Sequence, residues 1–160
     1  MIITSPNVID PPETPGVTPA KAIFLAGGIT NCPDWQQPVA ERLYEMTNLI
    51  IFNPRRLNWN MENSEVESKK QIIWEHNQLQ RAQIILFWFP EETLCPITLL
   101  ELGKYLVSDK KLIIGTHPNY QRRLDVLVQT ELVRREQDVY DNIDDMISEF
   151  IADYRAGMYS

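Results

Sequence analysis

The run Ile84-Ile85-Leu86-Phe87-Trp88-Phe89 decides the fold that this sequence predicts. Every side chain in it is apolar and Pro90 follows it, which is typical of a short strand buried on both faces. Similar apolar runs occupy residues 22–26, 49–52 and 111–115, and a short fifth strand is expected from Val139. Continuously apolar strands belong to parallel sheets that helices cover on both sides.

Helical patterns separate these runs. Apolar residues recur at helical spacing over residues 35–46, with Asp34 in the N-cap position, and further helices are expected over residues 65–81, 96–107, 123–132 and 141–155. On the helix over residues 65–81 we expect the inner side to hold Ile72, Ile73, His76 and Leu79. The alternation predicts an α/β protein with a flavodoxin-like, doubly wound parallel sheet of about five strands and helices on both faces.

Length and composition indicate one ordinary domain. The chain has 160 residues, of which 44% are hydrophobic and 23% charged, as in soluble globular proteins. We expect residues 21–160 to form a single domain. Residues 1–20 hold five of the eleven prolines, so we expect them to form an extended arm.

The charge and the apolar content narrow the class of partner. The net charge of −7 argues against binding of nucleic acid, whose phosphate backbone would be repelled. The apolar runs fall short of the roughly 20 residues that a membrane span needs, and the N-terminus lacks the basic region of a signal peptide. We therefore expect a cytoplasmic enzyme that acts on a small molecule and makes no contact with a membrane.

The cysteines and histidines do not form a metal-binding pattern. Cys32 and Cys95 are far apart without CxxC spacing, and His76 and His117 are solitary. Both cysteines precede proline on predicted loops, where they could line a pocket without taking part in chemistry. We therefore predict a reduced protein with no metal and no cofactor.

Glu101 is the strongest candidate for a catalytic residue. In Pro96-Ile97-Thr98-Leu99-Leu100-Glu101-Leu102-Gly103 it is a carboxylate among apolar residues, shortly after the strand over residues 84–89. In open α/β sheets, ligands bind beyond the carboxyl ends of the strands. An exposed helical glutamate is the alternative, but the apolar neighbours favour a functional role, and Thr98 lies one turn earlier, where it could orient the carboxylate.

Other candidates are weaker when taken singly. Gly27 and Gly28 follow the first strand, where they either bring the backbone close to a ligand or make a tight turn. The G-x-G-x-x-G pattern of dinucleotide-binding proteins is absent, which disfavours dinucleotide binding. Glu75 lies on a helix that is expected to return toward the pocket side of the sheet, which favours a functional role. The alternative is a glutamate on the solvent-exposed surface of that helix. Asp125 lies between two apolar residues, with a helix N-terminal charge as its alternative.

Together these stretches resemble the nucleoside 2-deoxyribosyltransferase family, from about residue 21 to residue 125. The resemblance rests on Ile23-Phe24-Leu25-Ala26-Gly27-Gly28-Ile29-Thr30, on Asn53-Pro54-Arg55, on Glu75 with Leu79 and Ala82, and above all on Cys95-Pro96-Ile97-Thr98-Leu99-Leu100-Glu101-Leu102-Gly103. The last motif is the most specific of the four.

The resemblance implies a ping-pong exchange of nucleobases on 2-deoxyribose, a reaction of nucleotide salvage. Glu101 matches the family's nucleophile, which forms a deoxyribosyl ester at C1′. Glu75 matches an acidic residue that protonates or positions the leaving base. The expected partners are 2′-deoxynucleosides and free nucleobases, and no cofactor is needed.

The resemblance also implies a homo-oligomer, a dimer or a dimer-based hexamer, with shared active sites. Asp125 falls near a family asparagine that reaches into the neighbouring subunit's site to hold the 5′-hydroxyl of the sugar. Trp35 and Trp59 are candidates for stacking on a base, with core packing as the alternative. The substrate-binding candidates are Gly27, Gly28, Asp34, Trp35, Asn53, Trp59, Thr98 and Asp125.

Two departures from the family pattern concern the support of the nucleophile. Cys95 replaces an acidic residue that some members carry six positions before it, and Phe24 replaces a tyrosine on the first strand. Both a purine-specific enzyme and one that also accepts pyrimidines fit this pattern. The alternatives are a hydrolase of 2′-deoxynucleoside 5′-monophosphates and a non-catalytic nucleotide-binding module.

Overall fold

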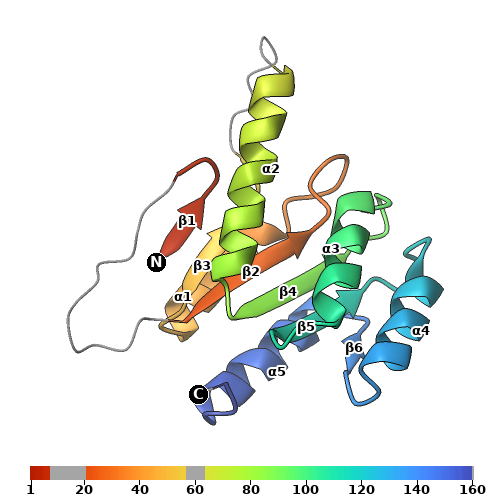
Figure 1. The fold of residues 1–160 in the computed structure, drawn as a ribbon. Coiled ribbons are helices and arrows are strands. Elements are labelled where there is room, and N and C mark those ends of the chain that lie inside the picture. Colours follow the sequence, from red (N-terminus) through yellow and green to blue (C-terminus); the bar gives the residue numbers. More distant parts are fainter. Residues whose placement is uncertain (8–20, 57–63, 160) are drawn as a thin grey trace.

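The structure, a computed structural model, describes residues 1–7, 21–56 and 64–159, and within them the sheet is parallel and six-stranded (Figure 1). Its strand order is β1-β3-β2-β4-β5-β6. The strands are β1 (Ile2–Thr4), β2 (Ala22–Gly27), β3 (Ile50–Asn53), β4 (Ile84–Phe89), β5 (Lys111–Thr116) and β6 (Val139–Tyr140). The helices are α1 (Gln36–Met46), α2 (Ser64–Arg81), α3 (Pro96–Leu106), α4 (Arg123–Val133) and α5 (Ile143–Arg155). The predicted α/β, flavodoxin-like class is confirmed.

Helices cover both faces of the sheet. Side chains alternate along each strand, so that Phe24 and Phe87 join the cluster under α2, α3 and α4, while Leu25 and Leu86 join the cluster under α1 and α5. Because strands β2 and β4 are buried on both faces, they have the continuous apolar sequences from which a parallel sheet was predicted.

The chain reverses its direction of travel across the sheet between β2 and β4. From β2 it crosses through α1 to β3 on one side, and from β3 it crosses through α2 to β4 on the other side of β2. The carboxyl ends of β2 and β4 are therefore neighbours whose following loops diverge, which leaves a crevice between them.

The start of the chain corrects the prediction of an arm over residues 1–20. Ile2–Thr4 form β1, which pairs with β3 in parallel register and buries Ile3. The backbone N–H of Ser5 then donates to the carbonyl of Asn53 at 3.2 Å. Three residues are too few to show a period, so the sequence did not reveal this strand. The rest of the predicted arm, residues 8–20, lies outside the described residues.

The inner face of α2 also differs from the prediction. Ile72, Ile73 and His76 are exposed, and of the four predicted side chains only Leu79 is buried. The face is set instead by Trp74, which is 4% exposed and contacts the rings of Phe24 and Phe52. Burying one indole removes more apolar surface from water than burying either isoleucine, and it rotates the helix accordingly. None of the helices in the described part of the chain is long and apolar enough to cross a membrane.

Candidate active site

A cavity of about 320 Å³ opens at the crevice between the carboxyl ends of β2 and β4. Its walls come from segments that are distant in the sequence: the end of β2 and the loop after it, Pro54 after β3, α2, and the loop between β4 and α3 with the first turns of α3. The lining residues are Phe24, Ala26, Gly27, Gly28, Ile29, Thr30, Pro54, Glu75, Thr93, Cys95, Pro96, Ile97, Thr98 and Glu101.

The start of α3 aims Glu101 at this cavity. Cys95 precedes the helix in a left-handed conformation (φ 48°), and Pro96 occupies the first turn, where its missing N–H costs nothing. Leu102 and Tyr105 are buried against the sheet and fix the rotation of the helix. Thr98 and Glu101, one turn apart, therefore lie on one face, which lines the cavity.

The Glu101 carboxyl has a strongly perturbed acidity. Burial raises its pKa to about 8, the negative charge of Glu75 adds to the rise, and Lys104 partly offsets it. Among the described residues, neither Thr98 nor any other side chain forms a hydrogen bond with this carboxyl. A carboxyl that is largely buried, without local donors and open to a cavity, is typical of a functional group.

Glu75 reaches the same cavity from α2 in a different setting. Burial raises its pKa, while a hydrogen bond from Gln71 and the charge of Arg56 act in the opposite direction. The Gln71 amide donates to Glu75 Oε1 at 2.7 Å. Both groups favour the charged form of Glu75, whereas among the described residues Glu101 has no hydrogen-bond donor of this kind.

Positions 27 and 28 require glycine because neighbouring segments approach their backbone closely. A Cβ at Gly27 would lie 2.4 Å from the Trp88 carbonyl oxygen, and one at Gly28 would lie 2.6 Å from Thr93 Cγ2. Gly27 thus allows the end of β2 to lie close to β4 and Trp35, and Gly28 allows the start of the following loop to lie against the loop after β4.

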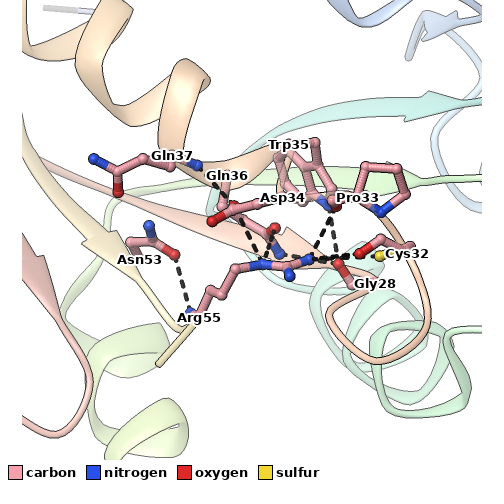
Figure 2. Close-up of polar contacts among 9 residues, drawn as sticks. All are labelled: Gly28, Cys32, Pro33, Asp34, Trp35, Gln36, Gln37, Asn53 and Arg55. Carbon is pink, nitrogen blue, oxygen red and sulfur yellow. Dashed lines mark hydrogen bonds and ion pairs between the residues drawn. The ribbon is translucent and has the colours of Figure 1, made fainter. Parts of the chain in front are cut away.

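Arg55 holds the loop after β2 in place (Figure 2). Its Nε donates to Gln36 Oε1 at 3.0 Å and pairs with Asp34 at 3.2 Å, and its Nη2 donates to the Pro33 carbonyl at 3.0 Å. Gln36 in turn donates to the Gly28 carbonyl at 3.1 Å. The guanidinium thus links the segment after β3 to the backbone that lines the cavity.

Five of the residues predicted for the site meet at the cavity: Glu101, Glu75, Gly27, Gly28 and Thr98. Three others lie behind its wall. Asp34 pairs with Arg55 and accepts from the Gln37 N–H at 3.1 Å, Asn53 accepts from the Arg55 N–H, and Trp35 donates its indole N–H to the Gly28 carbonyl at 3.0 Å. The Trp35 ring packs against Gly27, as expected if Trp35 belongs to the core packing and does not stack on a base.

The remaining two candidates are not at the cavity of this chain. Asp125 lies in the first turn of α4, half-exposed, and pairs with Arg122 at 3.0 Å. Trp59 lies outside the described residues.

Several residues at or near the cavity escaped prediction as site residues. Phe24 and Cys95, noted as departures from the family pattern, both line it, and Cys95 was also expected to be able to line a pocket; burial raises the pKa of its thiol to about 12. Thr30 and Thr93 also line it; Thr30 ends one of the stretches that carry the family resemblance, whereas Thr93 lies in none of them. Gln71 could have been found only from its spacing, one helical turn before Glu75. In the described part of the chain, no group of three or more His, Cys, Asp or Glu could hold a metal ion.

The fold and the cavity define a class: a parallel α/β protein that presents two carboxyl groups at its topological switch point. Comparison with protein families identifies the class more closely. Residues 20–120 match the family model described as "nucleoside 2-deoxyribosyltransferase like", which covers more than half of the chain and includes every residue that lines the cavity. The chain belongs to the nucleoside 2-deoxyribosyltransferase-like family. No curated protein sequence matches it.

Proposed function

We propose that this protein transfers 2-deoxyribose between nucleobases through a covalent ester on Glu101. The observation that carries the proposal is the pair of buried carboxyl groups, Glu75 and Glu101, on the walls of one cavity. Displacement at a glycosidic carbon with retention needs one carboxylate as nucleophile and one carboxylic acid as proton donor. Membership of the family supports the same chemistry.

The pair must hold one proton in the first half of the reaction. The Glu101 carboxylate attacks C1′ of the nucleoside, the C1′–N bond breaks, and the proton on Glu75 passes to the departing base nitrogen. Burial raises the pKa of both carboxyl groups, so the pair can retain a proton near neutral pH. Attack requires that this proton be on Glu75 and that Glu101 be ionised.

The second half reverses the first. A nitrogen of the incoming base attacks C1′, the ester bond breaks and returns the Glu101 carboxylate, and Glu75 accepts the proton of the incoming base. No water is consumed, and atoms and charge balance between the two halves. The apolar part of the wall (Phe24, Ala26, Ile29, Pro54, Ile97) would keep water from the ester.

A nucleoside fits the cavity better than a nucleoside 5′-monophosphate. Among the described lining residues there is no lysine or arginine, and two carboxyl groups face the cavity. A phosphate group would meet negative charge without a partner. This favours the transferase over the hydrolase of nucleoside monophosphates.

We also propose that the active form is a homo-oligomer. On α4, Leu124, Val128 and Leu132 form a stripe at helical spacing, and Leu124 and Leu132 are each 71% exposed. The adjoining α3 exposes Ile97 and Leu100, the latter next to Glu101. A second copy seated on this apolar face would bring Asp125 of one subunit close to the cavity of the other, as the family resemblance implies.

One exchange assay separates the alternatives. The protein is incubated with deoxyinosine and adenine, then with thymidine and adenine, and the bases and nucleosides are followed by chromatography. New deoxyadenosine supports transfer, whereas free base without a new nucleoside supports hydrolysis. No change with either donor, while binding is retained, supports a non-catalytic module.

The nucleophile is tested by trapping. A 2-fluoro-arabinosyl nucleoside should leave a covalent adduct on the peptide that contains Glu101, and Glu101→Ala should abolish both the adduct and the exchange. An adduct on another peptide would overturn the assignment.

A further inference from the structure

The side chain of Gln71 uses all of its hydrogen-bonding groups. Its Oε1 accepts from the Ser5 hydroxyl at 2.5 Å and from Arg56 Nε, and its Nε2 donates to the Pro54 carbonyl at 2.9 Å and to Glu75 Oε1 at 2.7 Å. The partners come from the chain start, the segment after β3, and α2.

These partners leave only one orientation for the amide. Arginine can only donate and a backbone carbonyl can only accept, so the oxygen of Gln71 must face Arg56 and its NH₂ must face Pro54. The NH₂ therefore also faces Glu75. Ser5 adds to this constraint, since its hydroxyl oxygen accepts from Arg56 Nε at 3.2 Å and its proton is directed to Gln71.

Arg56 is itself held in place by an acidic partner. Its Nη1 pairs with Glu67 at 2.9 Å, one turn before Gln71 on the same helix, and its side chain is 6% exposed. A buried, fixed cation thus lies behind the amide, and the amide passes its polarisation on to Glu75.

We propose that Gln71, held by Arg56 and Ser5, is a positioning residue that directs Glu75 Oε2 toward the reacting base and stabilises the carboxylate left after Glu75 gives up its proton. This rests on the role of Glu75 in the proposed function. Because Oε1 is engaged by a donor, the proton that Glu75 exchanges resides on Oε2. In the ester intermediate Glu101 is uncharged, so Glu75 is the buried carboxylate that needs a donor.

The charged and hydrogen-bonding groups that face Glu75 come from three places. Glu101 approaches from α3, with Lys104 beyond it, Arg56 from the segment after β3, and Gln71 from α2 itself. Any titration of Glu75 therefore has to be separated from that of Glu101.

The first test is independent of catalysis. In protein labelled with ¹³C at the glutamate carboxyl carbons, the Glu75 resonance is titrated in a Glu101→Gln background and in Glu101→Gln with Gln71→Met. Loss of the Gln71 donor should move the titration of Glu75 to higher pH. An unchanged titration overturns the proposal.

A matched control removes the same kind of bond elsewhere. Gln37 donates to Glu41 Oε1 at 2.8 Å across one turn of α1, on the exposed side of the helix. Gln37→Met should leave the titration of Glu75 unchanged. If Gln71→Met does not fold, the side-chain amide protons of Gln71 are followed in the Glu101→Gln protein, where their shifts should track the ionisation of Glu75; shifts that ignore pH would overturn the proposal.

The second test is kinetic. Gln71→Met should slow the first half-reaction, in which the Glu75 carboxylate forms, about 10- to 100-fold more than the second, in which it is consumed, so that mass spectrometry finds less deoxyribosyl-enzyme at steady state than in the unmodified protein. Equal slowing of both half-reactions would overturn the proposal, because it would indicate that Gln71 only maintains the fold. If the titration shifts while no donor supports exchange, the proposed function fails and the assignment of Gln71 to Glu75 stands.

Discussion

Glu101 on α3 and Glu75 on α2 line one cavity, and the negative charge of Glu75 contributes to raising the pKa of Glu101. The two carboxyl groups differ in their surroundings. Glu75 has a hydrogen-bond donor and a nearby cation, whereas Glu101 has apolar neighbours and only the offsetting charge of Lys104. The charged form of Glu75 therefore has more support than that of Glu101, and several of the expected results below depend on the raised pKa of Glu101.

The rate of base release should fall at alkaline pH. Since the reactive pair holds one proton and the pKa of Glu101 is about 8, the rate of a single turnover should decline above about pH 8, as the last proton leaves the pair. The measurement is base release between pH 5 and pH 10. With 7-methyl-2′-deoxyguanosine, whose cationic base leaves without a proton, the alkaline decline should disappear. A decline that persists with this donor would assign it to another group.

Replacing Glu101 should stabilise the fold at high pH. The folded-state pKa of Glu101 lies above its ordinary value of 4.5, so the folded state binds the proton more tightly and stability falls as the pH rises toward 8. Glu101→Gln lacks this loss and should gain about 1–3 kcal/mol in free energy of unfolding at pH 8.5. Urea unfolding at pH 4 and pH 8.5 measures it. An advantage of equal size at both pH values would refute the ionisation argument.

The glycines of this family member can be ranked by their surroundings. Gly27→Ala should lower the free energy of unfolding by about 2–3 kcal/mol, because its Cβ meets the backbone oxygen of Trp88. Gly103→Ala, on the same helix as Glu101, meets nothing within 4 Å and should raise stability by about 0.5–1 kcal/mol. Thermal unfolding of both variants measures these changes, and a Gly27→Ala protein of unchanged stability would contradict the close approach of Gly27 to Trp88.

Arg55 should affect substrate binding more than the chemical step. Arg55→Met removes the bonds that hold Gln36 and the Pro33 carbonyl, so the loop that supplies Gly28 loses its anchor, and KM should rise about tenfold with a smaller change in kcat. Arg42→Met, on α1, removes an exposed pair with Asp144 of α5 and serves as the control. An Arg55→Met protein with unchanged KM would show that the loop after β2 keeps its position without the guanidinium.

Shared sites should appear as complementation. Glu101→Ala is expected to be inactive and Asp125→Ala strongly impaired, yet mixed and re-associated subunits should recover about a quarter of the full activity, since one site in each mixed dimer then has both residues. Asp144→Ala replaces an aspartate of α5 and should not complement Glu101→Ala beyond the level expected by dilution. Failure to recover activity, with mixed oligomers present, would exclude Asp125 from a neighbouring site.

The sequence predicted the parts of this protein that follow a period or a motif. The central strand over residues 84–89 was predicted with its observed bounds, because burial on both faces leaves an uninterrupted apolar run. Glu101 and Glu75 were found because one lies in a specific motif and the other at a matching distance from it. Both line the cavity, although their chemical roles stay predictions.

What the sequence did not reveal depends on contacts between distant segments. The prediction of which face of α2 is buried was wrong, because the packing of Trp74 on Phe24 and Phe52 outweighs the apolar spacing of Ile72 and Ile73. Gln71 gives no sequence signal beyond its spacing from Glu75, since its other partners are Ser5, 66 positions away, and Arg56. Such polar networks are visible only when the fold brings their members together.

The edge strand β1 has a consequence for the order in which this protein assembles. Its pairing with β3 joins residues about fifty positions apart, and it is only three residues long, so it has the least to gain from docking early. We expect it to be the last strand to join during folding and the first to detach in native-state hydrogen exchange. Because Ser5 follows directly after it and contacts Gln71, each brief detachment would loosen the support of Glu75. Glu75 would then lose its alignment in transient openings that leave the rest of the sheet intact.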